Sequence, residues 1–289
     1  MVTAGPSGSG PPKRRRLLRF FACVCVGFLL TVPLYVGLAL SGVVRSPFFP
    51  RADGDIALAK SDRPGLRVLF VGNSFTYYND MPAMVHELAA ADRGAPQVFS
   101  VEYTAPSWSL RKASGNDGLE DLMADARWDV VVLQERSAYL SLSREWWGSE
   151  TLPFVLDLRH DIAADGAKTM LFMTWGYEHG DGRGDSYDRM QARVADGYEE
   201  LAELASADVA PVGLAWRAAV RDRPDLELWK GDGQHPTRQG SYLAACVFYR
   251  ELTGRDPLGS DYFGGLAEED ARLLQQVAGV AVDEYEATR

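Results

Sequence analysis

Short apolar runs alternate with longer helical stretches along most of the chain. The apolar runs are rich in β-branched and aromatic residues, which is typical of buried strands. They are Leu66–Val71, Gln97–Val101, Asp129–Leu133, Thr169–Thr174 and, more weakly, Ala207–Val212. The remaining stretches predict helices near Pro82–Ala91, Leu119–Asp125, Leu152–Ala164, Tyr187–Ala205, Gly213–Val220, Arg238–Leu252 and Leu266–Tyr285. Strands that alternate with helices predict an α/β fold, with a mostly parallel five-stranded sheet covered by helices on both faces.

The first 65 residues have a different pattern. Phe20–Val44 is a run of 25 residues without a charged side chain, and five basic residues precede it. At ~1.5 Å per residue, a helix of this length covers a hydrocarbon core of ~30 Å. The pattern predicts a cytoplasmic basic segment (1–19), a transmembrane helix or signal anchor (20–44), a linker (45–65) and an extracytoplasmic domain (66–289). Ala39-Leu40-Ser41 leaves open a cleaved signal and a secreted domain.

The charge distribution and the cysteine count argue against several functions. The chain carries a net charge of −10, which divides into +5 over residues 1–44 and −15 over the remainder. A domain this acidic repels phosphate backbones, so nucleic-acid binding is disfavoured. Two of the three cysteines lie in the apolar N-terminal run, and the four histidines are scattered. The sequence therefore predicts neither a disulfide framework nor a zinc site.

The end of the first predicted strand carries a candidate nucleophile. Gly72-Asn73-Ser74 directly follows the apolar run Val68–Val71. In open parallel sheets, ligands bind outside the carboxyl ends of the strands. Glycine permits a tight turn there, and Ser74 is left exposed at the strand's end. A serine hydroxyl becomes a nucleophile when a neighbouring base takes its proton, and backbone N–H groups of the turn can stabilise the resulting oxyanion.

A second motif, near the C-terminal end, supplies a candidate base. Asp232 precedes His235 by three residues in the glycine-containing loop Gly231–Thr237. This spacing lets the carboxylate bind the imidazole Nδ1 and leaves Nε2 free to face the serine. Pro236 favours an extended conformation at His235, so the loop presents the imidazole from a restrained turn. The same spacing in Asp157–His160 lies within a predicted helix and is interpreted as a surface pair.

Together, Gly72-Asn73-Ser74 and Asp232-x-x-His235-Pro236 resemble the motifs of the SGNH hydrolase superfamily, also called GDSL-like lipases and esterases. The resemblance covers Leu66 to about Gly254. It implies a flavodoxin-like three-layer α/β/α sandwich and hydrolysis of carboxylic esters through a triad of Ser74, His235 and Asp232. It also implies that the reaction needs no metal or organic cofactor.

The resemblance implies an oxyanion hole as well, and here the sequence departs from the family. Family members usually have a glycine after the second strand and an asparagine after the third, where this chain has Ser107 and Gln134. Ser107 keeps a backbone N–H, and Gln134 carries the same amide donor on a longer side chain. The predicted oxyanion hole therefore consists of Ser74, Ser107 and Gln134. A positive φ at Ser107 would be costly for a residue other than glycine.

Residues near the predicted strand ends are candidates for contacting the substrate. They are Asn73, Trp108 and Trp175, because aromatic rings at this edge can stack on sugar faces or line an acyl pocket. The predicted location and these rings favour a membrane-anchored esterase that acts on short-chain acyl esters of small molecules or carbohydrates. Two alternatives stay open, an acyltransferase that uses the same acyl-serine and a carbohydrate-binding domain without catalysis.

Overall fold

The computed structural model describes Met1 and residues 34–38, 45, 46, 48–182 and 184–289. The chain divides into two units, Met1–Phe49 and Pro50–Arg289. In the first unit, the Tyr35 hydroxyl donates a hydrogen bond to Ser46 Oγ at 3.0 Å. Of the predicted basic segment 1–19 and membrane segment 20–44, all but Met1 and 34–38 lie outside the described residues. Among the residues that are described, no helix is long and apolar enough to span a bilayer.

A six-stranded sheet forms the centre of the second unit, with the strand order β1-β3-β2-β4-β5-β6. The strands are β1 (Arg51–Gly54), β2 (Leu66–Gly72), β3 (Val98–Thr104), β4 (Val130–Leu133), β5 (Lys168–Phe172) and β6 (Asp208–Ala210). Strands β2 to β6 are parallel, which confirms the parallel sheet expected from the apolar runs. Strand β2 lies between β3 and β4, so the chain switches direction across the sheet at the end of β2.

The sixth strand, β1, corrects the prediction of five strands. It lies within residues 45–65, which the sequence indicated as a linker, and it pairs antiparallel with β3. Its sequence Arg-Ala-Asp-Gly is partly or fully exposed throughout. An edge strand of this kind has little apolar surface to bury, so it lacks the hydrophobic pattern by which strands are identified.

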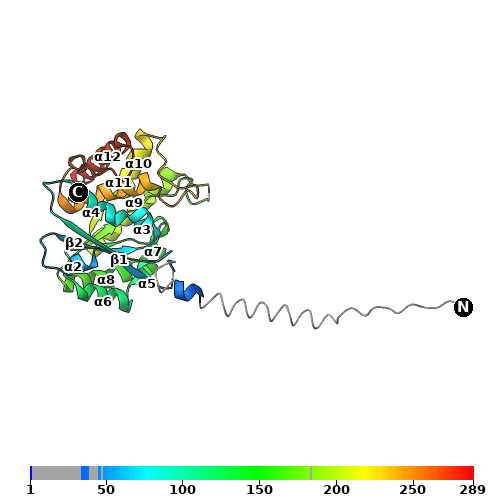
Figure 1. The fold of residues 1–289 in the computed structure, drawn as a ribbon. Coiled ribbons are helices and arrows are strands. Elements are labelled where there is room, and N and C mark those ends of the chain that lie inside the picture. Colours follow the sequence, from blue (N-terminus) through cyan, green and yellow to red (C-terminus); the bar gives the residue numbers. More distant parts are fainter. Residues whose placement is uncertain (2–33, 39–44, 47, 183) are drawn as a thin grey trace. The chain divides into compact units, whose positions relative to one another are not determined.

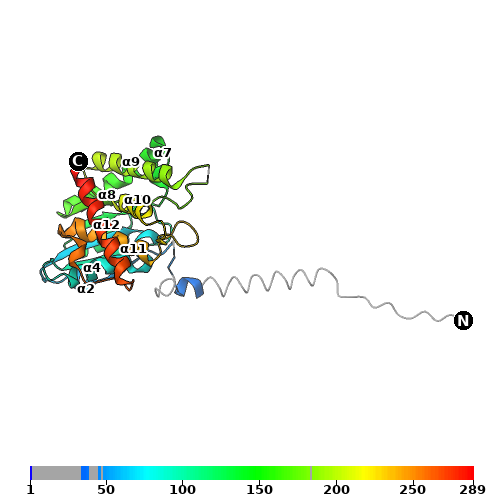
Figure 2. The ribbon, with the colours of Figure 1, turned by 90° about the horizontal axis from the view of Figure 1, so that it is seen from above.

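Helices cover both faces of the sheet, which gives three layers (Figure 1). One layer contains α4 (Met81–Ala91), α10 (Val212–Asp222), α11 (Arg238–Thr253) and α12 (Glu268–Ala287). Figure 2 views this layer from above, where α11 lies beside both α4 and α12. The other layer contains α2 (Ile56–Ala59), α5 (Leu110–Ala113), α6 (Asp117–Asp125), α7 (Arg144–Glu150), α8 (Leu152–Ala164) and α9 (Tyr187–Ala205). Short helices α3 (Ser74–Tyr77), η1 (Tyr78–Asp80), η2 (Tyr139–Ser141) and η3 (Pro257–Gly259) lie in the connections.

Strand β2 shows why the apolar runs are continuous rather than alternating. Val68 and Phe70 pack in the core beneath α4 and α11, whereas Leu69 and Val71 pack in the core on the opposite face. All four side chains are at most 1% exposed. Because helices cover both faces, each residue of the strand must be apolar, which is the pattern that a parallel sheet requires.

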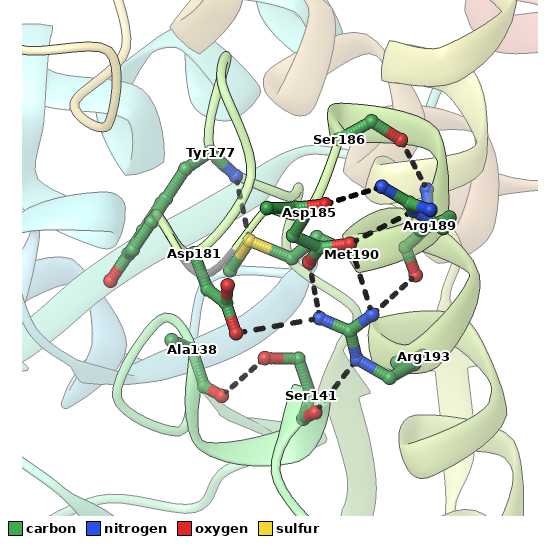
Figure 3. A network of polar contacts seen from close by, with 10 residues as sticks. Ala138, Ser141, Tyr177, Asp181, Asp185, Ser186, Arg189, Met190 and Arg193 are labelled. Atoms are coloured by element: carbon green, nitrogen blue, oxygen red, sulfur yellow. Dashed lines mark hydrogen bonds and ion pairs between the residues drawn. The ribbon is translucent and has the colours of Figure 1, made fainter.

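The loop between β5 and α9, residues 173–186, is anchored by an arginine of α9 (Figure 3). The Arg193 guanidinium donates to both carboxylate oxygens of Asp185 and, at 3.1 Å, to the carbonyl oxygen of Ser141. The hydrogen bond from Arg193 lowers the pKa of Asp185 to about 2. On its other side the loop contacts the C-terminal motif, because the Glu178 N–H donates to Gly233 O at 2.9 Å.

Candidate active site

The candidate nucleophile lies at the point where the sheet changes direction. Strand β2 ends at Gly72, and Ser74 is the first residue of α3. A Cβ atom at Gly72 would lie 2.6 Å from both Gln134 Oε1 and Thr76 Oγ1, so only glycine fits there. Asn73 caps the helix, because its side-chain oxygen accepts a hydrogen bond from Phe75 N–H at 3.2 Å. The expected turn is therefore present, and the helix that follows β2 begins at Ser74 itself.

The candidate base lies on a short hairpin. Its two arms are joined by the bridge between Trp229 and Pro236 and by the hydrogen bond from Lys230 N–H to His235 O at 2.8 Å. Gly233 turns the chain between them with a φ of +67°. Asp232 therefore precedes His235 on one rigid loop, as the spacing predicts.

The Asp232 carboxylate orients both the loop and the imidazole. Its Oδ1 accepts hydrogen bonds from the N–H groups of Gln234 and His235, each at 2.9 Å. Its Oδ2 lies 2.6 Å from His235 Nδ1. Burial alone would raise the pKa of Asp232, but the backbone donors and the imidazole outweigh it and lower this pKa to about 2. The carboxylate is therefore ionised wherever the imidazole can act as a base.

The structure brings the two distant motifs together. His235 Nε2 lies 2.9 Å from Ser74 Oγ, although the two residues are 161 positions apart in the sequence. Because an ionised carboxylate accepts only, the Nδ1 proton points to Asp232 and Nε2 is left to accept the serine proton. This arrangement is that of a serine nucleophile with an oriented general base.

Asn79 fastens the hairpin to the segment that carries Ser74, a contact that the sequence did not indicate. Its Nδ2 donates to Thr237 O at 3.0 Å and to Ser241 Oγ at 2.9 Å, and lies 3.3 Å from Pro236 O. Ser241 Oγ in turn donates to Tyr78 O at 3.1 Å. Asn79 has a φ of +57°, a conformation that asparagine tolerates better than most residues.

Aromatic rings hold the imidazole in place. Tyr78 stacks on the His235 ring with 4.6 Å between ring centroids, and Phe75 meets it edge-on at 5.8 Å. Lys230 Nζ lies 4.8 Å from the centroid of Tyr78. These contacts oppose rotation of the His235 side chain on two sides. Both aromatic rings come from the segment that follows Ser74.

Two backbone N–H groups are suited to bind an oxyanion. Ser74 is at the N-terminus of α3, where an N–H has no carbonyl acceptor in the preceding turn. Ser107 is exposed at the tip of a turn closed by a hydrogen bond from Trp108 N–H to Ala105 O. It has a φ of +55° at the position of this turn that glycine usually occupies. Asn73 Nδ2 holds the turn against the end of β2 by donating to Trp108 O at 2.8 Å.

Gln134, the third candidate for the oxyanion hole, is placed differently. Its side chain is fully buried, and Oε1 accepts hydrogen bonds from Asn73 N–H at 2.9 Å and Thr76 Oγ at 3.0 Å. Its amide nitrogen donates to Glu135 O. Because the amide is buried and both its oxygen and its nitrogen are hydrogen-bonded inside the protein, Gln134 holds the nucleophile turn in this structure.

The three candidates for substrate contact are buried beneath the loops. Asn73, Trp108 and Trp175 are 2%, 3% and 0% exposed. Trp175 is stacked between Phe75 and Trp216, and its Nε1–H donates to Gln234 O at 3.0 Å. These residues support the catalytic loops from beneath. The sequence could show that they lie at strand ends but not on which side of the loops they would pack.

Searches for related sequences and structures differ in outcome. No family model matches the sequence, and no curated protein matches it. Among solved structures, a protein from Slackia heliotrinireducens assigned to the SGNH hydrolases is 29% identical, with a TM-score of 0.54 over 65% of this chain and 99% of its own. A DUF4886 family protein from Bacteroides uniformis is 20% identical, with a TM-score of 0.61 over 75% of this chain and 95% of its own. An acetyl xylan esterase, AlAXEase, is 14% identical, with a TM-score of 0.52 over 65% of this chain and all of its own.

These likenesses agree with the motifs and with the layered sheet. The resemblance to the SGNH hydrolases that the sequence indicated is confirmed. In its fold and in the order of its two motifs, the chain is similar to the SGNH hydrolases.

Proposed function

We propose that this protein is a serine hydrolase of carboxylic esters in which Ser74 is the nucleophile, His235 the general base and Asp232 the residue that orients it. The observation that carries the proposal is the chain of two short contacts, 2.9 Å from Ser74 Oγ to His235 Nε2 and 2.6 Å from His235 Nδ1 to Asp232 Oδ2. The likeness to SGNH hydrolases supports the same reaction class.

The geometry gives each group a role in acyl transfer. As Ser74 Oγ attacks the ester carbonyl carbon, His235 Nε2 takes the hydroxyl proton, and the ionised Asp232 stabilises the imidazolium. The carbonyl oxygen becomes an oxyanion, which we expect the N–H groups of Ser74 and Ser107 to bind. When the tetrahedral intermediate collapses, His235 returns its proton to the departing alcohol, and an acyl-serine remains. Water then repeats the sequence and releases the acid.

The open surroundings of the site favour short acyl groups. The side chains of Asp232 and His235 are 48% and 27% exposed. A long acyl chain needs an apolar cleft that buries most of its surface, whereas a small acyl group needs little apolar contact. We therefore expect acetyl and similarly short esters to be hydrolysed faster than long-chain lipid esters, with carbohydrate-borne acetyl groups as the natural class.

Hydrolysis of p-nitrophenyl acetate by the soluble 45–289 fragment tests the proposal. Wild type should show turnover, and Ser74→Ala and His235→Ala should each lose at least about 10³-fold in kcat, because the triad acts as a unit. A fluorophosphonate probe should label wild type and not Ser74→Ala. Unchanged labelling in Ser74→Ala would exclude this serine as the nucleophile. If a sugar acceptor diverts the acyl group from acetate to an acylated sugar, the enzyme is a transferase with the same intermediate.

We further propose that residues 20–44 anchor the domain in the membrane with the catalytic unit outside the cytoplasm. The uncharged run of 25 residues and the basic cluster before it support this orientation. Fusion of alkaline phosphatase after Arg289 gives an active reporter if the C-terminal side is exported. The alternative of a secreted domain is distinguished by the mass of the mature chain, which would lack the residues before about Ser41.

A further inference from the structure

A cavity lies against the hairpin that carries Asp232 and His235. Its volume is about 710 Å³, within the range of about 300–1,000 Å³ that small-molecule sites occupy. One wall is formed by Trp229, Lys230 and Gly231, which lead directly into Asp232. Tyr187 at the start of α9 and Glu178 of the β5–α9 loop also line it. We call this cavity the hairpin pocket.

The floor of the hairpin pocket is apolar and aromatic. Leu226 and Leu228 are buried, and Trp229 is partly buried beside them. The rings of Tyr187 and Trp229 meet edge to face, with 5.0 Å between their centroids. Trp229 is fixed because its Nε1–H donates to Gly176 O at 3.1 Å. A rigid indole at the base of an open cavity offers a surface to the C–H face of a sugar ring.

The rim is polar and mostly acidic. Glu178, Asp225 and Glu227 line it, with Lys230 as the one lining ammonium among the residues described. Asp225 is paired with Arg223 at 2.7 Å, so Glu178 and Glu227 are the carboxylates best able to accept hydrogen bonds from a ligand. Carboxylates accept strong hydrogen bonds from hydroxyl groups, and they repel anions. This rim selects against uronic acids and phosphorylated sugars.

We propose that the hairpin pocket binds an uncharged sugar unit of a glycan whose acyl ester reacts at Ser74. Cleavage of the ester at Ser74 rests on the proposed function, whereas binding of the sugar unit in the hairpin pocket does not. The sugar ring packs on Trp229, and its hydroxyl groups donate to Glu178 and Glu227. Binding energy gained away from the reacting carbonyl raises kcat/KM for the glycan relative to a small ester that has no such unit.

The β5–α9 loop gives the pocket a fixed geometry. Glu178 stands on this loop, and its N–H is bonded to Gly233 O in the hairpin at 2.9 Å. Arg193 holds the far end of the loop through Asp185 (Figure 3). Glu178 and the wall formed by Trp229, Lys230 and Gly231 are therefore both connected to the hairpin that presents the imidazole. The pocket thus keeps a fixed position relative to Ser74, His235 and Asp232.

Binding is measured on the Ser74→Ala protein with unacylated xylohexaose by titration calorimetry. We expect saturable binding that weakens at least tenfold in Glu227→Lys and in Glu178→Gln, each made in the Ser74→Ala background. The matched control is Glu203→Lys, which makes the same charge change on an exposed position at the far end of α9. Unfolding temperatures establish that each variant is folded.

Kinetics on the protein with Ser74 intact complete the test. The ratio of kcat/KM for acetylated xylooligosaccharide to that for p-nitrophenyl acetate should fall at least tenfold in Glu227→Lys and stay at the wild-type value in Glu203→Lys. The proposal is overturned if xylohexaose does not bind, if Glu227→Lys binds it as well as the control does, or if polygalacturonate binds more tightly. Absence of sugar binding in a protein that cleaves p-nitrophenyl acetate refutes the pocket alone, whereas sugar binding without cleavage of either ester refutes the proposed function alone.

Discussion

Asn79 offers a direct test of whether the two catalytic segments depend on a side-chain clamp. Replacement by glycine removes the two well-formed hydrogen bonds to Thr237 O and Ser241 Oγ and the longer contact with Pro236 O. At about 0.5–1.5 kcal/mol for each well-formed bond, the loss is about 1–3 kcal/mol. Glycine also adopts the φ of +57° without a steric penalty, which offsets about 1 kcal/mol. The net destabilisation of Asn79→Gly is therefore about 1 kcal/mol, or about 2–4 °C in Tm for a domain of this size.

The effect on catalysis should be larger than the effect on stability. Without the clamp, the hairpin is free to move relative to Ser74, and a displacement of about 1 Å at a reacting group can cost about 10²-fold in rate. We expect kcat for p-nitrophenyl acetate to fall by about 10- to 100-fold, with a smaller change in KM. Asn79→Asp should lose more, because a carboxylate would face two carbonyl oxygens.

The neighbouring residue, Asp80, provides the control for Asn79→Gly and the comparison that can refute the clamp. Asp80 has a φ of +56°, and among the hydrogen bonds of the described residues none joins its side chain to the hairpin. Asp80→Gly therefore changes the same type of backbone position without touching the clamp. In a double-mutant cycle, Ser241→Ala should cost less in the Asn79→Gly background than in wild type, because the two side chains share one hydrogen bond, whereas the bond from Ser241 Oγ to Tyr78 O is lost in both backgrounds. A kcat for Asn79→Gly within twofold of that for Asp80→Gly would refute the clamp.

Three further predictions follow from individual residues. Ser107→Gly should raise Tm by about 1–3 °C, because glycine adopts a φ of +55° without strain, and a fall in kcat would show that the serine hydroxyl itself takes part. Burial raises the pKa of Glu135 to about 7, despite hydrogen bonds from Arg136 N–H, Thr151 Oγ and Leu110 N–H. The folded state thus holds this proton more tightly than the unfolded state, so its stabilising effect is complete below pH ~4.5 and is lost as the pH rises to ~7. Glu135→Gln should therefore flatten the decline in Tm between pH 5 and pH 8, and an unchanged slope would assign the decline to other groups. Arg193→Met should lower Tm more at pH 7 than at pH 2, because Asp185 is ionised in the folded state above a pKa of about 2 and loses its nearer arginine partner. The variant should also speed proteolysis within 173–186. Arg189→Met, which removes only the longer ion pair with Asp185 at 3.4 Å, should have the smaller effect on both readouts.

The apolar runs determined the layered sheet because the strands are buried on both faces. A strand such as Leu66–Gly72 cannot be anything but apolar when helices pack above and below it. The same reasoning could not find β1, because an edge strand with the sequence Arg-Ala-Asp-Gly carries no such constraint. It is fixed instead by its backbone pairing with β3.

The two candidate catalytic motifs were predicted from local chemistry, and the structure brings them together. The spacing from Asp232 to His235 sets their mutual contact within one loop, so this part of the site is readable from the chain. The approach of His235 to Ser74 depends on how β2 and the hairpin are placed by the sheet and by α11. No local pattern carries that information.

What the sequence by itself determined is the set of groups that make contacts with near neighbours: the glycine turn, the Asp-His pair and the alternation of strands and helices. What only the tertiary structure decided is the direction in which side chains at the strand ends point. Gln134, Trp108 and Trp175 were all correctly expected at that edge, but each turns inward and supports the loops. Asn79, which had no motif, turns toward the hairpin, and Trp229 of the hairpin turns toward Gly176 of the β5–α9 loop. The physical reason is that a residue's position along a strand follows from local periodicity, whereas the burial of its side chain depends on which distant segment packs against it.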